Sequence, residues 1–527
     1  MPNKMNISTP QKKLIIYIFL TVVTLAVYWQ VNQFDFVNID DEIYVTQNSR
    51  VQSGITLDGF RWTFFTTYAQ FWHPLTWLSL MFDYQLYGLN AGGYHLTNII
   101  LHILSALLLF WLFNRMTGAV WKSAFVAAAF ALHPLHVESV AWIAERKDVL
   151  SAFCWMLTLC LYVYYTEKPV IKRYLLVVFC FVLALMSKSI VVTLPAIMIL
   201  LDYWPLGRFE SKKDNLFLWQ LKEKTPFFVL SALFSIITYL AQYNRTANNF
   251  SWSSRLANAP VSFVTYLGKT IWPHDLAIFY PFPIQTPVWP VIGASLLIIF
   301  ISAFVIVMAK RRPSLFVGWA WYAISILPVM GIIQVGRQAM ADRFTYLPLI
   351  GLGIMLAWGI PLLLPSENSR KKILFPAGII LIALWAWGAW QQCGYWKNSR
   401  ELFNHALQVT KNNYLAHNNL GLVFFAEGKT TEAIEHYNEA IHMMPDHILI
   451  YKNRGDAYIR LGLYQRAIED YNEAIRLKPD YADFYNKRGS VYLYQGNRAP
   501  GCRDAQKACE LGNCGILKAA QGKGDCR

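Results

Sequence analysis

Long apolar segments alternate with short polar loops along most of the chain. An apolar segment of about 17–23 residues is long enough to cross the hydrocarbon core of a bilayer as a helix. We predict such helices near residues 14–31, 95–115, 123–143, 149–166, 173–187, 190–204, 226–243, 288–309, 315–333, 346–364 and 373–391. No small-residue cleavage site follows the first segment, so we interpret it as a retained helix rather than a removed signal peptide. The pattern predicts an all-α fold in which residues 1–395 form a polytopic membrane helical bundle of about eleven spans.

From Trp396 onward the pattern becomes polar and repeats with a period of 34 residues. The recurring positions are Gly421, Gly428, Ala433, Tyr437, Ala440 and Pro445, then Gly455, Gly462, Ala467, Tyr471, Ala474 and Pro479, with a partial third copy at Gly489, Gly496 and Ala508. Small residues at these positions let the two helices of a hairpin pack closely, and the spacing resembles the tetratricopeptide repeat. We therefore predict that residues 396–527 form a short α-solenoid. Such arrays bind peptides or proteins in a concave groove, and a purely structural or oligomerising role is the alternative.

Composition and charge assign this chain to the membrane proteins. With 55% hydrophobic and only 15% charged residues, the 527-residue chain has too little polar surface to coat a soluble globule. Its net charge of +15 does not indicate nucleic-acid binding, because the basic residues form short clusters between apolar segments, where the positive-inside rule places them in the cytoplasm. The clusters are Lys4/Lys12/Lys13, Arg115/Lys122, Lys168/Lys172/Arg173, 208–224, Lys310–Arg312 and Arg370–Lys372. With the N-terminus inside, an odd number of spans places loop 32–94 and the C-terminal domain outside.

Four cysteines crowd into the C-terminal end of the chain. Cys502, Cys509, Cys514 and Cys526 lie within the last 26 residues, a density typical of disulfides in an oxidising compartment. A metal site is the alternative, but no histidine lies nearby and the spacing is irregular. The sequence predicts disulfides here without determining their pairing.

An acid cluster, Asp40-Asp41-Glu42, follows the first apolar segment. Carboxylates at a membrane boundary are costly to hold, and so they usually have a chemical role. A carboxylate can take the proton of an incoming hydroxyl group in a transfer reaction. We therefore expect Asp40 or Asp41 to be catalytic. In the alternative, structural interpretation these residues cap an interfacial helix or pair with Arg50 or Arg61.

Further polar strings stand at the predicted outer ends of later spans. They are His133 to Glu138 continuing to Glu145–Asp148, Ser187–Ser189, and Arg337 with Asp342–Tyr346, and the outer segment 244–287 adds Arg245, Arg255, Lys269 and His274. A reaction on a lipid phosphate requires cations that hold the anionic leaving group beside the carboxylate base. The residues that we expect to contact the donor phosphate or the substrate are His133, His136, Glu138, Arg146, Lys188 and Arg343.

These expectations also have alternatives. His133, His136 and Glu138 have a spacing that suits a metal ion, or they hydrogen-bond to neighbours at a helix end. Lys188 could instead extend its ammonium group to the membrane surface. Arg343 could instead form an ion pair with the preceding residue, Asp342. The tryptophans are more typical of an interfacial belt than of a sugar-stacking platform.

Several strings resemble the transmembrane-and-tetratricopeptide O-mannosyltransferases of the GT-C superfamily. The strings are FVNIDDEIYV, HPLTWLS, GYHLTNIILH and HPLHVESVAWIAERKDVLS, followed by the repeats. The resemblance implies a polyprenyl- or dolichyl-phosphate-linked sugar donor, inversion at the anomeric carbon and transfer to a protein hydroxyl on the outer face. It also implies that the first-loop acid, here Asp40 or Asp41, is the base. The departures are the short repeat array and His73, which occupies the basic position before the proline of the PLT string and joins the expected substrate-binding residues.

We therefore expect an integral membrane glycosyltransferase that moves a sugar from a polyprenyl-phosphate carrier to an acceptor hydroxyl, a protein Ser or Thr. The basic inner loops and the Cys-rich end are typical of a Gram-negative inner-membrane protein with a periplasmic tail, where undecaprenyl phosphate would replace dolichol. The lipid-linked sugar would be the co-substrate, the acceptor would dock on the repeats, and a divalent metal is not favoured. The alternatives are transfer to a lipid or surface glycan, and a non-catalytic scaffold that uses its repeats to assemble an envelope complex.

The alternation of basic loops predicts the topology. A reporter that is active only in the periplasm should be active when fused after Arg527 and inactive when fused at Ser211. The opposite result would place the acid loop 32–94 on the cytoplasmic side and contradict the topology.

Overall fold

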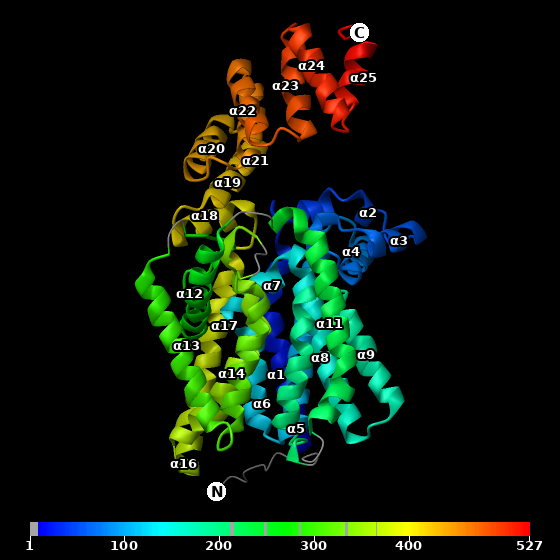
Figure 1. Cartoon of the computed structure of the whole chain (residues 1–527). Coiled ribbons are helices and arrows are strands. Elements are labelled where there is room, and N and C mark those ends of the chain that lie inside the picture. The colour runs from blue at the N-terminus through cyan, green and yellow to red at the C-terminus, as the bar shows by residue number, and fades with distance from the viewer. Residues whose placement is uncertain are drawn as a thin grey trace. The chain divides into compact units, whose positions relative to one another are not determined.

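Helices make up most of the computed structural model (Figure 1). The residues that the structure describes are 9–210, 216–246, 250–283, 286–332, 336–364 and 366–526. In these residues the only strands are β1 (Tyr280–Pro281) and β2 (Gln338–Met340), which pair antiparallel with Tyr280 opposite Met340. The all-α fold class is therefore confirmed. The chain divides into two compact units, Met1–Asn398 and Ser399–Arg527.

Some residues of the basic clusters and the outer segment lie outside this description. They are Lys4, the part 211–215 of the loop 208–224, and the side chain of Arg245.

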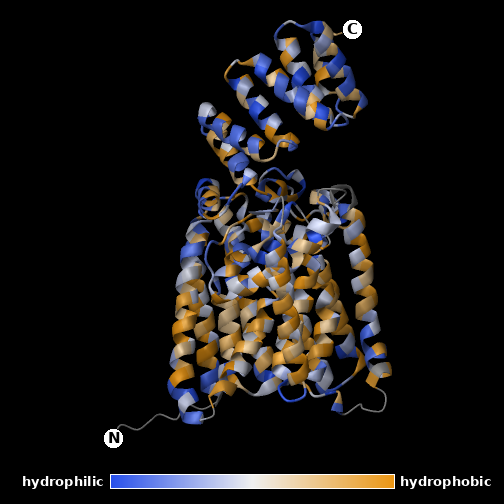
Figure 2. Cartoon of the chain, turned by 60° about the vertical axis from the view of Figure 1, so that its left-hand side comes forward, coloured by the Kyte–Doolittle hydropathy of each residue, from blue (hydrophilic) through white to orange (hydrophobic). Residues whose placement is uncertain are grey.

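Six helices in the described part of the first unit are long and apolar enough to cross a membrane. They are α1 (Thr9–Tyr28), α5 (Ala91–Thr117), α8 (Arg146–Glu167), α11 (Leu216–Thr246), α13 (Val288–Met308) and α17 (Phe375–Gly394). A seventh span results if α6 (Val120–Leu132) and the segment Pro134–Ala141, bent by 52°, are counted as one. Apolar residues dominate these helices (Figure 2), as membrane-spanning helices require.

Every one of the predicted spans contains a helix, but the count of about eleven is not confirmed, because several of these helices are short. The short ones are α7 (Val137–Ala141), α9 (Ile171–Leu185), α10 (Leu194–Tyr203), α14 (Pro313–Ile326) and α15 (Leu349–Gly359). Polar strings lie at the breaks between these helices. Two of them contain the short helices η4 (Pro134–His136) and η5 (Ile143–Glu145), which flank α7. Lys188 precedes a third short helix, η6 (Ser189–Thr193), and η9 (Asp342–Thr345) precedes α15. The interruptions free backbone groups that need internal partners within a bilayer. Polar side chains therefore collect at these breaks.

Further helices lie between the predicted spans or at the ends of these spans. They are η1 (Trp29–Gln33), η2 (Glu42–Thr46), α2 (Ser49–Gln52), α3 (Leu57–Phe65), η3 (Tyr68–Gln70), α4 (Pro74–Tyr87), α12 (Trp252–Ile271), η8 (Leu327–Val329), η10 (Ile360–Leu363), α16 (Glu367–Ser369) and η11 (Arg370–Leu374). Side-chain caps start several of them: Asn48 accepts from the backbone of Arg50, and Thr56 accepts from that of Gly59. Most of these helices are short or mix polar and apolar residues, so a search for long apolar segments does not find them as separate helices.

The second unit consists of helix pairs with the predicted period. Its helices are α18 (Ser399–Val409), α19 (Tyr414–Ala426), α20 (Thr430–Met443), α21 (Ile448–Arg460), α22 (Tyr464–Leu477), α23 (Ala482–Tyr494), α24 (Arg498–Glu510) and α25 (Gly515–Gly522). A Cβ atom at Gly421 would lie 2.4 Å from the ring of Tyr437, and one at Gly455 would lie 3.0 Å from that of Tyr471. The recurring glycine is therefore needed so that the recurring tyrosine can pack between the helices of a pair.

The C-terminal cysteines form two disulfides, which confirms that they are oxidised rather than metal-bound. Cys502 pairs with Cys526, and Cys509 pairs with Cys514. Both bridges lie in the helix pair formed by α24 and α25 and in the residues directly after it. They cross-link α24 to the segments that follow it.

The contact at Gly421 generates a stability prediction. Gly421→Ala should lower the thermal stability of the repeats, because overpacking against a buried ring typically costs about 1–3 kcal/mol. Gly522→Ala is the matched control, because no atom lies within 4 Å of the added Cβ there. Thermal unfolding of the full-length protein, followed by circular dichroism, would compare them. Equal transitions in both variants would contradict the close packing at Gly421.

Candidate active site

Asp41 ties the first loop to the start of α8. Its carboxylate is buried and accepts two backbone hydrogen bonds, from Val37 to Oδ2 and from Ala144 to Oδ1, both at 2.9 Å. The indole of Trp142 adds a third link by donating to the carbonyl of Ile39 at 3.1 Å. Burial raises the pKa of Asp41 to about 8, although the two backbone hydrogen bonds act in the opposite direction. Both carboxylate oxygens are thus engaged in holding the loop.

The neighbouring Asp40 is held differently. Its φ of 61° lies in the left-handed region, which Asp tolerates better than most residues. Its side chain is partly exposed, and no donor among the described residues binds its carboxylate. Backbone conformations of this kind cluster at functional sites, where the surrounding structure enforces them. The geometry leaves Asp40 available to a substrate while Asp41 positions the loop.

Glu145 is the centre of a buried ion cluster. Its carboxylate lies 3.0 Å from the ammonium of Lys147, 3.1 Å from that of Lys188 and 3.2 Å from Nε of Arg343. Lys188 also reaches Asp148 at 2.5 Å. Three segments that are far apart in sequence therefore meet at one carboxylate.

Glu138 completes this cluster from α7. One of its oxygens pairs with the guanidinium of Arg343, and the other accepts from the backbone N–H of Arg343 at 2.9 Å. The preceding residue, Asp342, instead accepts from the hydroxyl of Tyr280 at 2.9 Å, and burial raises its pKa to about 6. Arg343 thus pairs with Glu138 and Glu145. The alternative interpretation of the sequence, an ion pair between Arg343 and Asp342, is therefore wrong. The cluster holds three carboxylates and three cations: Glu138, Glu145, Asp148, Lys147, Lys188 and Arg343.

His73 borders the cluster from the start of α4. Its ring is buried and stacks on Tyr44 and Phe71, with centroids 5.6 and 5.8 Å away. The ammonium of Lys147 lies 4.8 Å above the ring of Tyr44. Burial, followed by the charges of Lys147 and Lys188, holds the pKa of His73 well below its usual value. His73 is therefore a neutral residue that lines the cluster without adding positive charge.

Arg146 points away from this cluster, although it lies between Glu145 and Lys147 in sequence. Its guanidinium is fully buried and donates to Asp83 at 2.6 Å, to Asn98 at 2.5 Å, to Ser79 at 2.8 Å and to the carbonyl of Tyr94 at 2.9 Å. These partners belong to α4 and α5. The structure does not bring Arg146 to the expected phosphate site but uses it to join three helices.

His133 and His136 also lie apart from the cluster, at the bend between α6 and α7. Nε2 of His133 lies 3.0 Å from the carbonyl of Thr270, and Nδ1 of His136 lies 2.7 Å from that of Phe130. Both rings are buried among neighbouring aromatic residues. Across the described ranges, no three His, Cys, Asp or Glu residues are arranged to hold a metal ion.

Three members of the cluster received no role from the sequence. Glu145, Lys147 and Asp148 belong to the same polar string as Arg146, but Arg146 is the residue of this string that the sequence predicts at the phosphate. The available signal was the spacing of Glu145 and Asp148, because residues three positions apart share a face at the start of a helix.

Comparison with known proteins supports both parts of the chain. The model of the TPR repeat matches residues 421–462 and 455–496, which confirms the predicted repeats. Protein O-mannosyl-transferase TMTC1 of Homo sapiens is 24% identical over 468 residues, which cover 77% of this chain and 52% of that protein. Protein O-mannosyl-transferase F38B6.6 of Caenorhabditis elegans is 25% identical over 371 residues, covering 69% of this chain and 52% of that protein.

A further relative agrees with these two. Protein O-mannosyl-transferase TMTC4 of Homo sapiens is 24% identical over 470 residues, covering 76% of this chain and 63% of that protein. The chain thus spans about half to somewhat under two thirds of the length of the curated relatives that it matches. Over most of its own length, this chain is similar in sequence to the protein O-mannosyl-transferases and is a distant relative of that family.

Proposed function

We propose that this chain is an integral membrane glycosyltransferase that moves a sugar from a polyprenyl-phosphate carrier to a protein Ser or Thr hydroxyl. One observation carries the proposal: the Asp40 carboxylate is bound by no described residue, and Asp41 attaches its loop to the edge of the ion cluster around Glu145, which contains three cations. A base beside cations is what transfer from a phosphate ester requires. The sequence similarity to protein O-mannosyl-transferases supports the same reaction class.

In this mechanism Asp40 takes the proton of the acceptor hydroxyl as its oxygen attacks the anomeric carbon. A carbon–oxygen bond to the acceptor forms while the bond to the carrier phosphate breaks, and the electron pair leaves with the phosphate. Attack from the side opposite the phosphate inverts the anomeric carbon. The positive charges of Lys147, Lys188 and Arg343 stabilise the departing phosphate.

The state of the cluster suits an anionic substrate. Lys188 and Arg343 keep exposed fractions of 15% and 13%, against 7% for Lys147, so these two cations are placed to meet a phosphate. The raised pKa of Asp41 keeps that carboxyl mostly neutral at pH 7, which reduces the negative charge beside the phosphate. Arg146, His133 and His136 then act as positioning residues in the surrounding helices.

We place this site on the periplasmic face of a bacterial inner membrane, with the N-terminus in the cytoplasm and the repeats outside. The end of the membrane unit supports this arrangement, because the carbonyl of Lys397 accepts from Asp35 at 3.1 Å and Trp396 packs on Trp142. The chain therefore leaves the membrane unit beside the first loop. Repeats on this face would offer their groove to the acceptor protein, with undecaprenyl phosphate as the carrier and no metal required.

The role of Asp40 is tested by removing its charge. Asp40→Asn should reduce transfer by about 10²–10⁴-fold, because that is the typical contribution of a general base. The matched control is Glu42→Gln in the same loop, whose exposed side chain should be dispensable. The measurement is transfer of sugar from polyprenyl phosphate to envelope proteins in membranes that contain equal amounts of each variant.

The outcomes separate the alternatives. Wild-type transfer by Asp40→Asn would remove Asp40 from the mechanism. A product found on a lipid or surface glycan rather than on protein would change the acceptor class. No glycosyl product with the wild-type chain would favour the scaffold.

The pKa of Asp41 predicts how stability depends on pH. Because the folded protein raises this pKa from 3.8 to about 8, it binds the proton more tightly than the unfolded chain does. The resulting stabilisation is fully present below about pH 4 and is lost as the pH rises through 8. The melting temperature of the wild type should therefore fall between pH 5 and pH 8.5 more steeply than that of Asp41→Asn. Parallel curves for the two proteins would contradict a raised pKa.

A further inference from the structure

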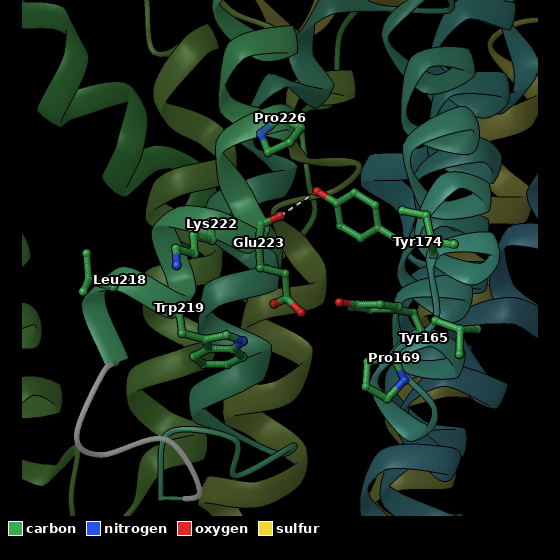
Figure 3. Close-up of a pocket in the computed structure, with 10 residues that line it drawn as sticks. Tyr165, Pro169, Tyr174, Leu218, Trp219, Lys222, Glu223 and Pro226 are labelled. Atoms are coloured by element: carbon green, nitrogen blue, oxygen red, sulfur yellow. Dashed lines mark hydrogen bonds between the residues drawn. The ribbon is translucent and has the colours of Figure 1, made fainter.

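A pocket of about 730 Å³ opens at the end of α8 that lies away from the candidate active site (Figure 3). It lies between the last turn of α8, the first turns of α9 and the N-terminal part of α11. Tyr165 lines it, whereas Asp148 belongs to the active-site cluster on the same helix, and at 1.5 Å per residue the two are about 26 Å apart along the axis. The pocket is therefore separate from the active site.

A neutral ion network lies beside this pocket and reaches it through Glu223, which is one of the lining residues. Glu223 binds Arg208 at 2.9 Å and Lys224 at 2.5 Å, and Asp202 binds the same two cations at 2.8 and 3.1 Å. The hydroxyl of Tyr174 donates to the backbone carbonyl of Glu223 at 2.8 Å, as Figure 3 shows. Two carboxylates and two cations thus compensate one another. The network places polar groups beside the pocket without adding net charge.

Lys222 adds one positive charge that this neutral network does not compensate. Its exposed side chain lines the pocket, and it forms no ion pair with any residue that the structure describes. The walls are aromatic and apolar, and Trp219 is held in place by the guanidinium of Arg208, 4.5 Å above its ring. A ligand of this pocket therefore meets one free positive charge at the rim and apolar surface on its sides.

The position of the pocket relative to the bilayer indicates the shape of that ligand. The span Ile143–Glu167 ends at the pocket and the span Leu218–Gln242 begins there, which places it at the boundary between headgroups and hydrocarbon. Beyond it, apolar side chains are exposed along both bordering helices, including Leu176 and Phe179 on α9 and Val229 on α11, with exposed fractions of 48%, 59% and 60%. A molecule with a polar end and long hydrocarbon chains matches both surfaces.

We propose that this pocket binds the headgroup of an anionic phospholipid. The phosphate group pairs with Lys222, the ester region packs on Trp219 and Tyr165 at the level where aromatic residues favour the interface, and the acyl chains follow α9 and α11. Basic pockets between membrane helices recognise anionic headgroups through this combination of charge and apolar surface. The site is independent of the transfer reaction proposed above.

The proposal is tested on the full-length chain purified in detergent. Native mass spectrometry would measure binding of phosphatidylglycerol and of phosphatidylcholine with the same acyl chains. We expect phosphatidylglycerol to bind more tightly, and Lys222→Gln to weaken its binding about fivefold, the effect expected for one lysine near an anionic surface. Lys222→Arg should retain the preference. Lys172→Gln is the matched control, because this exposed lysine near the start of α9 does not line the pocket.

Three results would overturn the proposal. Equal binding of the two lipids would exclude recognition of the anionic headgroup. Equal weakening by Lys222→Gln and Lys172→Gln would show a diffuse surface effect instead of a site. Undecaprenyl phosphate that binds more tightly than phosphatidylglycerol, and depends on Lys222, would assign the pocket to the carrier lipid.

Discussion

The membrane unit is organised by the need to satisfy every polar group at a helix break from within the protein. Its breaks near α7, before η6 and at η9 bring Glu145, Lys188 and Arg343 to one place, although they lie far apart in the sequence. Glu145 accepts from cations on all three segments. A single carboxylate therefore decides how these helices meet, and the first loop is attached to the same junction through Asp41 and Ala144.

Mutual compensation explains why so many charges can be buried. Removing one partner of a buried pair costs about 3–5 kcal/mol, because the other charge is left uncompensated. The cluster avoids this cost by matching its carboxylates with cations. Asp40 is the exception, since its backbone is in the left-handed region and its carboxylate has no donor within the described residues. In the proposed mechanism, a substrate hydroxyl is the partner of this carboxylate.

Near each end of α8 lies a balanced ion cluster with one additional charged residue beside it, and the two additional residues have opposite charge. Near one end the carboxylate of Asp40 has no donor among the described residues, in the loop that Asp41 attaches to a balanced cluster. At the other end a cation, Lys222, is left beside the balanced network of Asp202 and Glu223. A balanced cluster holds the surrounding helices firmly and leaves the remaining charge to a molecule from outside. We propose proton abstraction from an acceptor for the first and binding of an anionic headgroup for the second.

The sequence by itself determined the positions of the long apolar helices, the repeats and the presence of disulfides. Hydropathy, a period of 34 residues and a cysteine cluster are local properties that can be read along the chain. It also showed which polar strings interrupt apolar segments. Only the tertiary structure decided which member of each string reaches the cluster, because the chain passes from η5 into α8 at Arg146 and partners from distant segments determine where each side chain lies. Glu145 and Lys147 consequently face the cluster, whereas Arg146 between them faces Asp83. The same reason separates Asp40 from Asp41, since the partner that binds Asp41 lies at Ala144, far along the chain, and no local pattern reveals it.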